Sequence, residues 1–197
     1  LAVDATGVAC CSQGADCGIA GTVEMPLWDV LQVTSMSELF NGKGQFNADI
    51  GSWDTSRVTT MYRMFNSAGK FNQHLSRWDV SSVTNMGYMF WYADAFNKMP
   101  VGWDTSKVTS SSGMFKAADA WYARFEGGDD NTLPGGGWTR KDNACDASLA
   151  PLNGAVGSCT DTLVSGTSCM PYCDARYVRQ GVTSCTDRVL TEVAVCV

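Results

Sequence analysis

The sequence predicts a mainly β protein, a short solenoid of four to five stacked rungs followed by a small disulfide-rich β module. The first observation is a repeat in which tryptophan recurs every 25 residues, and a fixed period of this length is typical of stacked arrays. These tryptophans are Trp28, Trp53, Trp78 and Trp103. The second observation is that six of the nine cysteines fall between Cys145 and Cys196, which indicates a disulfide framework.

Two phenylalanine columns keep the same 25-residue period and complete the predicted core. Trp121 takes the aromatic place in the last copy of the second column. The columns are Phe40, Phe65, Phe90 and Phe115, and then Phe46, Phe71 and Phe96. Because one rung cannot bury its own aromatic face, we expect equivalent residues to stack into one continuous core. Truncation of a central member, such as Trp78→Ala, is expected to cost about 3–5 kcal/mol.

Each copy reads as short extended pieces joined by turns, not as a pair of helices. In the third copy the extended pieces are residues 75–78 and 83–86, and Asp and Ser between them are turn formers. Asparagines also recur, and we expect them to form an inward-facing ladder that satisfies backbone groups left free at each turn. They are Asn47, Asn72 and Asn97.

Three aspartates, Asp54, Asp79 and Asp104, form a column of like charges. Such a column is unfavourable unless each carboxylate is compensated. We favour turn capping, because the following Ser or Thr supplies the amides that such caps use. Calcium held between successive aspartates is the alternative, and these three residues are the only weak candidates for a metal site.

The predicted organisation has three parts. Residues 1–26 form an N-terminal cap that contains Cys10, Cys11 and Cys17. Residues 27–142 form the repeat array, with a glycine-rich loop inserted at 126–135 and Trp138 as a degraded last rung. Residues 143–197 form the second, cysteine-rich module.

Composition excludes several classes of protein. The net charge is −6, and the 14 basic residues are scattered, so the sequence has no basic stripe for nucleic acid. The apolar runs are short and interrupted, so no transmembrane segment is expected. A single histidine and the absence of paired short cysteine spacings argue against structural zinc, and no cofactor is expected. The cysteines indicate an oxidising compartment.

The repeat strings FNADIGSWDTSRVTTMYRMF, FNQHLSRWDVSSVTNMGYMF and FNKMPVGWDTSKVTSSSGMF resemble the 25-residue repeats of BspA-like leucine-rich-repeat surface proteins. The resemblance covers about half of the chain. It implies a solenoid on a cell surface, engaged in adhesion and in binding of other macromolecules. Ser111 replaces the methionine of the earlier copies, which suits a rung near the end of the stack.

The tail resembles a sushi (complement-control) module, through Cys145, Asn153-Gly154, Cys173, Tyr177, Gly181, Cys185 and Cys196 in that order. The pairing of that family implies the disulfides Cys145–Cys185 and Cys173–Cys196. Cys159 and Cys169 would then form an additional pair. Six cysteines allow 15 pairings, so this assignment depends on the resemblance.

Catalysis has little support in the sequence. His74 is the only histidine, so any triad that contains histidine must use it, and it occupies a variable position expected to face solvent. The carboxylates Asp129 and Asp130 lie in the inserted loop without a fixed scaffold. We therefore expect no enzymatic activity.

The function expected is that of an extracellular or surface scaffold or adhesion protein that contacts other protein chains or surface polymers. The alternatives are a lumenal accessory subunit of a large membrane complex, such as a photosynthetic complex in the thylakoid lumen of an alga, and a carbohydrate-binding module. Carbohydrate binding would use exposed aromatics, of which the candidates are Trp91-Tyr92 and Trp121-Tyr122.

Partner contact is expected on the flank of the array and on its inserted loop, at Asp129, Asp130 and Asn131. Loops on a rigid scaffold are where recognition tends to lie. We expect deletion of this loop to leave the fold intact. If all six tail cysteines pair, Cys10, Cys11 and Cys17 cannot all pair with one another, so one is free or bonded to another chain.

Overall fold

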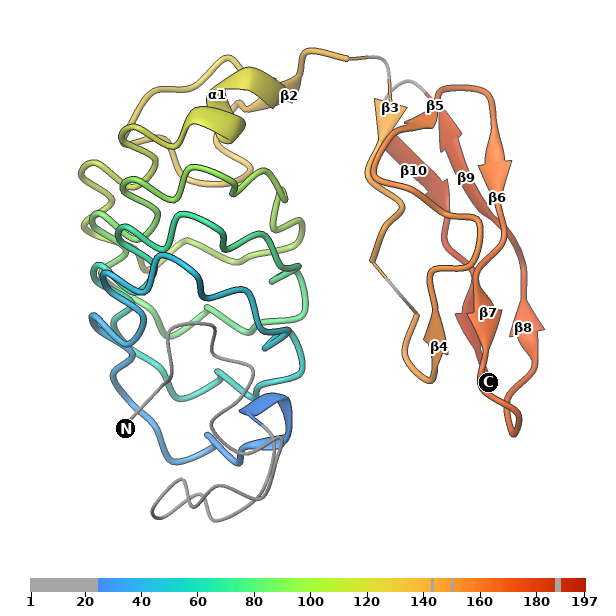
Figure 1. Ribbon diagram of the computed structural model, residues 1–197, viewed down its shortest axis with the longest axis horizontal. Coiled ribbons are helices and arrows are strands. Elements are labelled where there is room, and N and C mark those ends of the chain that lie inside the picture. The colour runs from blue at the N-terminus through green and yellow to red at the C-terminus, as the bar shows by residue number, and fades with distance from the viewer. Residues whose placement is uncertain (1–24, 143, 150, 187–188) are drawn as a thin grey trace. The chain divides into compact units, whose positions relative to one another are not determined.

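The computed structural model describes residues 25–142, 144–149, 151–186 and 189–197, and the predicted N-terminal cap with its three cysteines lies almost entirely outside them. The described chain is mainly β with little helix, and it contains small antiparallel sheets and three disulfides. It divides into two compact units whose boundary falls between Thr139 and Arg140. Each unit is described by itself below (Figure 1).

The regular elements are short. The helices are η2 (Met25–Leu27), a 3-10 turn, and α1 (Asp119–Arg124). The strands are β1 (Phe125–Glu126), β2 (Thr139–Arg140), β3 (Ala144–Cys145), β4 (Gly154–Ala155), β5 (Leu163–Val164), β6 (Ser168–Cys169), β7 (Tyr172–Cys173), β8 (Arg179–Gln180), β9 (Thr183–Thr186), β10 (Val189–Glu192) and β11 (Val195–Cys196).

In the first unit, successive copies of the 25-residue repeat lie side by side in parallel, from the blue to the yellow part of Figure 1. Single bridging residues join them in the series Ser35, Thr60, Asn85 and Ser110. Each copy also donates backbone hydrogen bonds to the next. The amide of Phe65, for example, donates to the carbonyl of Met89 at 2.9 Å, and the amide of Phe90 donates to Met114 at 2.8 Å.

The extended piece expected at 83–86 contains the bridging residue Asn85. The extended piece expected at 75–78 is wrong, because residues 76–77 form a turn. This turn and the next one are each closed by a backbone hydrogen bond. The Trp78 amide donates to the carbonyl of Leu75 at 3.0 Å, and the Val83 amide donates to Val80 at 2.9 Å.

Phenylalanine rings occupy the interior of the repeats in two stacked columns. Phe65 and Phe90 lie 5.5 Å apart between ring centroids and 9° from parallel, and Phe90 continues to Phe115 at 5.6 Å. In the second column Phe96 stacks on Trp121 at 5.8 Å, so Trp121 occupies the aromatic place expected of it. All these rings are buried, and stacking of this kind contributes about 0.5–1.5 kcal/mol per pair beyond area burial.

The repeating tryptophans are anchored by their indole nitrogens. Trp53 donates its Nε1 hydrogen to the carbonyl of Met25, Trp78 to Ile50 and Trp103 to Leu75, all at 2.9–3.0 Å. Each bond spans 28 residues of sequence. The side chain of one copy therefore satisfies the backbone of the copy before it, which fixes the register between copies.

The asparagine column performs the backbone role expected of it. The Asn72 amide donates to Oδ1 of Asn47 at 2.8 Å, and the Asn97 amide donates to Oδ1 of Asn72 at 3.1 Å. These side chains are exposed or half-buried, not inward-facing as predicted. They act as linkers along the surface of the stack.

The last copy departs from the others by forming α1, which the sequence pattern did not predict. Its N-terminal turn carries Asp119 and its last turn carries Arg124, charges that complement the helix dipole. Trp138 then packs edge-on against Phe115 and Trp121, at interplanar angles of 79° and 86°. Trp138 therefore ends the aromatic columns as a perpendicular cap rather than as a further stacked rung.

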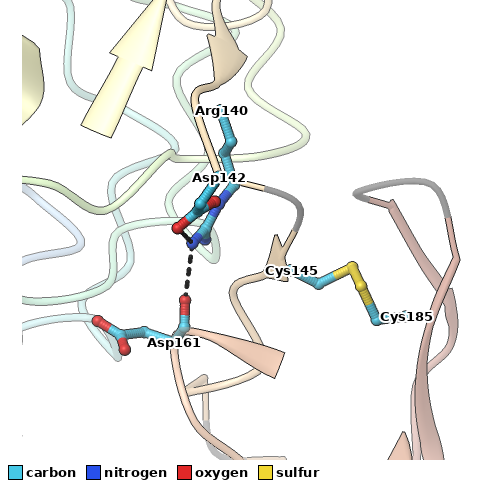
Figure 2. Close-up of polar contacts among 5 residues, drawn as sticks. All are labelled: Arg140, Asp142, Cys145, Asp161 and Cys185. Carbon is cyan, nitrogen blue, oxygen red and sulfur yellow. Dashed lines mark hydrogen bonds and ion pairs between the residues drawn. A yellow bond between two sulfur atoms is a disulfide. The ribbon is translucent and has the colours of Figure 1, made fainter. Parts of the chain in front are cut away.

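The second unit is built from paired two- to four-residue strands. β3 pairs with β5, β4 with β7 and β8 with β11, while β9 lies between β6 and β10, all antiparallel. Its small core consists mainly of cystines, including Cys145–Cys185. Close to this disulfide, Arg140 holds Asp142 through two bonds of 2.6 and 2.7 Å and donates to the carbonyl of Asp161 at 3.0 Å (Figure 2).

Candidate functional site

One edge of the first unit carries many residues that change from copy to copy. We call this edge the turn edge, and it consists of residues 37–42, 62–67, 87–92 and 112–117. Its third and fourth positions hold an apolar Leu or Met and a Phe, all buried except the partly buried Leu39, whereas its other positions change from copy to copy. The equivalents of Trp91, for example, are Asn41, Asn66 and Lys116. Surface chemistry on this edge is therefore independent of core packing.

The backbone of the turn edge takes an unusual conformation twice in each copy. The second position is left-handed throughout, at Glu38, Arg63, Tyr88 and Gly113, with φ between 53° and 62°. The sixth position is also left-handed, at Gly42, Ser67, Tyr92 and Ala117, with φ between 52° and 72°. Non-glycine residues rarely adopt this region, so packing of the neighbouring copies must hold it.

Four aromatic side chains lie together on the turn edge of the second and third copies. Tyr62 meets Tyr88 edge-on, with centroids 6.1 Å apart. Tyr88 meets Trp91 at 5.2 Å, and Trp91 lies beside Tyr92 at 5.4 Å with only 23° between the ring planes. Tyr92 is 50% exposed and the other three are half-buried. This aromatic cluster, unlike the core columns, is open to solvent.

Two cations contact the aromatic cluster. The Arg63 guanidinium lies over Tyr62, Tyr88 and Trp91, at 5.1, 5.5 and 5.9 Å from the ring centroids. The ammonium of Lys116 lies 5.7 Å from the Trp91 ring. Arg63 also lies 4.0 Å from Glu38, but both side chains are substantially exposed, so this ion pair is weak.

The inserted loop forms hydrogen bonds with the last copy of the repeat. Asn131 accepts the Gly113 amide through Oδ1 at 2.8 Å and the Ser111 hydroxyl through its carbonyl at 2.7 Å. The carbonyl of Asp130 accepts the Phe115 amide at 3.2 Å. In earlier copies, the amides equivalent to those of Gly113 and Phe115 donate to the next copy. The loop therefore ends the stack by supplying the acceptors that a further copy would have provided. The expectation that its deletion leaves the fold intact is therefore revised.

Within this loop Asp129 and Asp130 also have intramolecular partners. Asp129 accepts the Thr132 hydroxyl at 2.7 Å and the Asn131 amide at 3.0 Å, and these bonds lower the pKa of its carboxyl. Asp130 accepts the Tyr122 hydroxyl at 2.6 Å. Burial, followed by this hydrogen bond, raises the pKa of the Tyr122 phenol well above its ordinary value. Asn131 and both aspartates, the predicted contact residues, are therefore part of the end cap.

The aspartate column caps turns. Asp54, Asp79 and Asp104 each accept the amide two residues ahead, from Ser56, Ser81 and Ser106, at 2.9–3.0 Å. Hydrogen bonds from the serine side chain and then from its amide lower the pKa of all three carboxyls. Among the described residues, no group of three or more histidine, cysteine, aspartate or glutamate side chains could hold a metal ion.

The aromatic candidates for sugar binding separate into two cases. Trp121 is fully buried in the core, so it is not available to a ligand and that part of the prediction is wrong. Tyr122 is half-buried, with its hydroxyl on Asp130. Trp91 and Tyr92, by contrast, belong to the aromatic cluster of the turn edge. His74, the only histidine, is half-buried.

All six tail cysteines are paired, as Cys145–Cys185, Cys159–Cys169 and Cys173–Cys196. Cys145–Cys185 and Cys173–Cys196 are the pairs that the resemblance to a sushi module implied, and Cys159–Cys169 is the additional pair expected. Three disulfides indicate an oxidising environment. Cys10, Cys11 and Cys17 lie outside the described residues.

With this geometry in view, comparison with known proteins identifies one family. The model of the family described as Mycoplasma protein of unknown function, DUF285, matches residues 17–126, which is more than half of the 197 residues. The chain belongs to the DUF285 family. No curated protein and no solved structure matches it. The DUF285 match covers all four turn-edge segments and ends at the beginning of the inserted loop. Within the described ranges, no helix has the length and apolar character needed to cross a membrane.

The aromatic cluster as a whole, with Arg63 and Lys116, was not predicted from the sequence. Its members are separated by up to 54 positions, from Tyr62 to Lys116, and each stands where other copies have a different residue. The signal that could have found it is an alignment of the copies that asks which edge positions carry aromatic or basic side chains.

Proposed function

We propose that the protein is a non-enzymatic extracellular or surface scaffold that acts through contacts with other protein chains or surface polymers. One observation carries this proposal. The aromatic side chains that recur with the period are buried in the stacked columns, whereas residues that vary between copies occupy the half-buried and exposed positions of the turn edge. A rigid stack with a variable edge suits recognition, as in other repeat proteins.

We also propose that the copies are rungs of a BspA-like leucine-rich-repeat solenoid of four to five rungs and that the tail is a sushi-like module. The parallel bridges at 25-residue spacing support the first assignment. The pairing Cys145–Cys185 with Cys173–Cys196 supports the second.

The proposal of a non-enzymatic protein rests on how the reactive side chains are used. The carboxylates of the aspartate column cap turns, and those of the inserted loop close the end of the stack. The six tail cysteines form disulfides. A turnover that disappears in His74→Ala would contradict this part of the proposal.

A location outside the cell is the favoured reading, and a thylakoid-lumenal accessory subunit is the alternative. Both compartments would suit the three disulfides. Membrane-impermeant biotin applied to intact cells that make the protein separates them. Labelling of the intact cells supports a surface location. Labelling only after lysis, together with co-migration with a membrane complex on native gels, supports the lumenal alternative.

A further inference from the structure

The aromatic cluster is a partly exposed platform of ring faces and hydroxyl groups. Trp91 and Tyr92 are stacked at 5.4 Å with 23° between their ring planes, and Tyr88 adjoins Trp91 at a tilt of 45°. A pyranose ring has an apolar C–H face and a polar rim. Aromatic faces complement the first, and the hydroxyls of Tyr62, Tyr88 and Tyr92 are suited to the second.

The platform is positively charged although the protein is acidic. Arg63 and Lys116 both lie over its rings, while the net charge of the chain is −6. Placement of two cations on one small aromatic surface of an anionic protein favours a ligand that is itself anionic. Glu38, the acidic neighbour of Arg63, lies at 4.0 Å and is 49% exposed in its side chain, so it only partly offsets this charge.

The cluster also retains hydrogen-bonding capacity. Nε of Arg63 and Nε1 of Trp91 are buried, and neither has a hydrogen-bond acceptor among the residues that the structure describes. A buried donor without an acceptor is destabilising. An incoming carboxylate that drew Arg63 off the rings would offset part of this destabilisation, because guanidinium groups bind carboxylates through two parallel bonds.

We propose that the turn edge binds an acidic polysaccharide, with sugar rings stacked on Trp91 and Tyr92 and uronate carboxylates on Arg63 and Lys116. This inference rests on the proposed function and names its ligand class. A polysaccharide fits better than an acidic peptide, because the four rings and their three phenol hydroxyls, held on two adjacent copies, match the apolar face and the polar rim of a sugar.

The repeat itself supplies the test variants. Asn66 and Ser67 stand in the second copy where Trp91 and Tyr92 stand in the third, with the same left-handed conformation at Ser67 and Tyr92. The double variant Trp91→Asn, Tyr92→Ser therefore places residues that this backbone already accepts. Lys116→Asn follows the same logic, because Asn41 and Asn66 are its equivalents. Tyr172→Ser, at an exposed tyrosine of the tail, and Lys70→Gln, at an exposed lysine, are the controls.

Binding is measured by calorimetry with polygalacturonate, neutral dextran and polyglutamate. We expect polygalacturonate to bind and its affinity to fall as salt is raised. We expect weakening by at least about tenfold in the Asn-Ser variant and a smaller loss in Lys116→Asn, with both controls unchanged. Equal affinity for dextran would overturn the role of charge, and equal affinity for polyglutamate would overturn the role of the sugar ring.

Failure of this inference is separable from failure of the proposed function. If polygalacturonate does not bind, or if the Asn-Ser variant binds it as well as the parent, the ligand assignment is overturned. Surface labelling of intact cells would still support the scaffold proposal. If the protein instead labels only after lysis, the scaffold proposal fails whatever the polysaccharide result.

Discussion

Trp78 donates its indole hydrogen to the carbonyl oxygen of Ile50, 28 residues earlier in the chain, at 3.0 Å. The same bond recurs one copy before and one copy after. Because the donor belongs to one copy and the acceptor to the preceding one, this bond forms only when the two copies are stacked in the correct register.

Replacement of Trp78 by phenylalanine keeps an aromatic ring and removes this bond. We expect the free energy of unfolding to fall by about 1–3 kcal/mol, because the Ile50 carbonyl loses its buried donor. Urea denaturation measures the change. Trp91→Phe is the matched control, since the Trp91 indole donates no hydrogen bond. Equal losses in the two variants would show that the hydrogen bond does not contribute.

Acid should weaken the turns of the repeats. The pKa values of Asp54, Asp79 and Asp104 are lowered in the folded protein, so their contribution to stability is present above the ordinary aspartate value of 3.8. It is lost as pH falls through the lowered values. We expect Asp79→Ala to be less stable than the parent at pH 7, with a difference that shrinks below about pH 4.

Asp79→Asn is the control for this pH dependence, because an amide oxygen still accepts the Ser81 amide but does not ionise. Its stability should lie between those of the parent and the alanine variant at pH 7. Thermal unfolding from pH 2.5 to 7 records all three proteins. A difference in stability between the parent and Asp79→Ala that widens in acid would contradict the expected loss of this stabilisation at low pH.

At the left-handed sixth position of the turn edge, replacing alanine by glycine and replacing glycine by alanine should change stability in opposite directions. Ala117 has φ 52°, so Ala117→Gly should stabilise by about 0.5–1 kcal/mol through relief of strain. Gly42 has φ 72°, and a Cβ there would meet nothing within 4 Å. Gly42→Ala should therefore destabilise by about 1 kcal/mol for conformational reasons alone. Chemical denaturation of both variants checks the pair, and effects of the same sign would refute the explanation.

The end cap should be required for stability. Asn131→Ala removes the acceptor of the buried Gly113 amide, and we expect a loss of about 1–3 kcal/mol. Asn131→Asp, which keeps the acceptor oxygen, should lose less. Hydrogen exchange at the Gly113 amide, measured by NMR, reports the bond directly. Unchanged exchange in Asn131→Ala would mean that the loop does not cap the stack.

The stacked aromatic columns could be predicted from the sequence, because equivalent residues of every copy pack in the same way. Phe65 and Phe90 stack since they are 25 residues apart, and Trp121 could be placed in its column by the same period. The turn at 76–77, where an extended piece was expected, was not predictable in this way. Whether a polar segment extends or closes a three-residue turn depends on its neighbouring copy, which supplies the opposing carbonyls.

The candidate site was less accessible to sequence reasoning. Asp129 and Asp130 read as solvated loop carboxylates, and only the fold shows that their loop replaces the missing neighbour of the last copy. Trp91 and Tyr92 were recognised as one possible sugar-binding pair. Their joining with Tyr62, Arg63 and Lys116 required the stacking of three copies.

Retention of the protein at the cell surface is the decisive test of a surface protein that binds through its turn edge. The parent and the Trp91→Asn, Tyr92→Ser variant are produced in the cells that make the protein, and the fraction that stays on washed, intact cells is measured. We predict that the parent is retained and that the variant, equally folded by circular dichroism, is released into the medium. Equal retention of the two proteins, or confinement of both inside the cell, would contradict it.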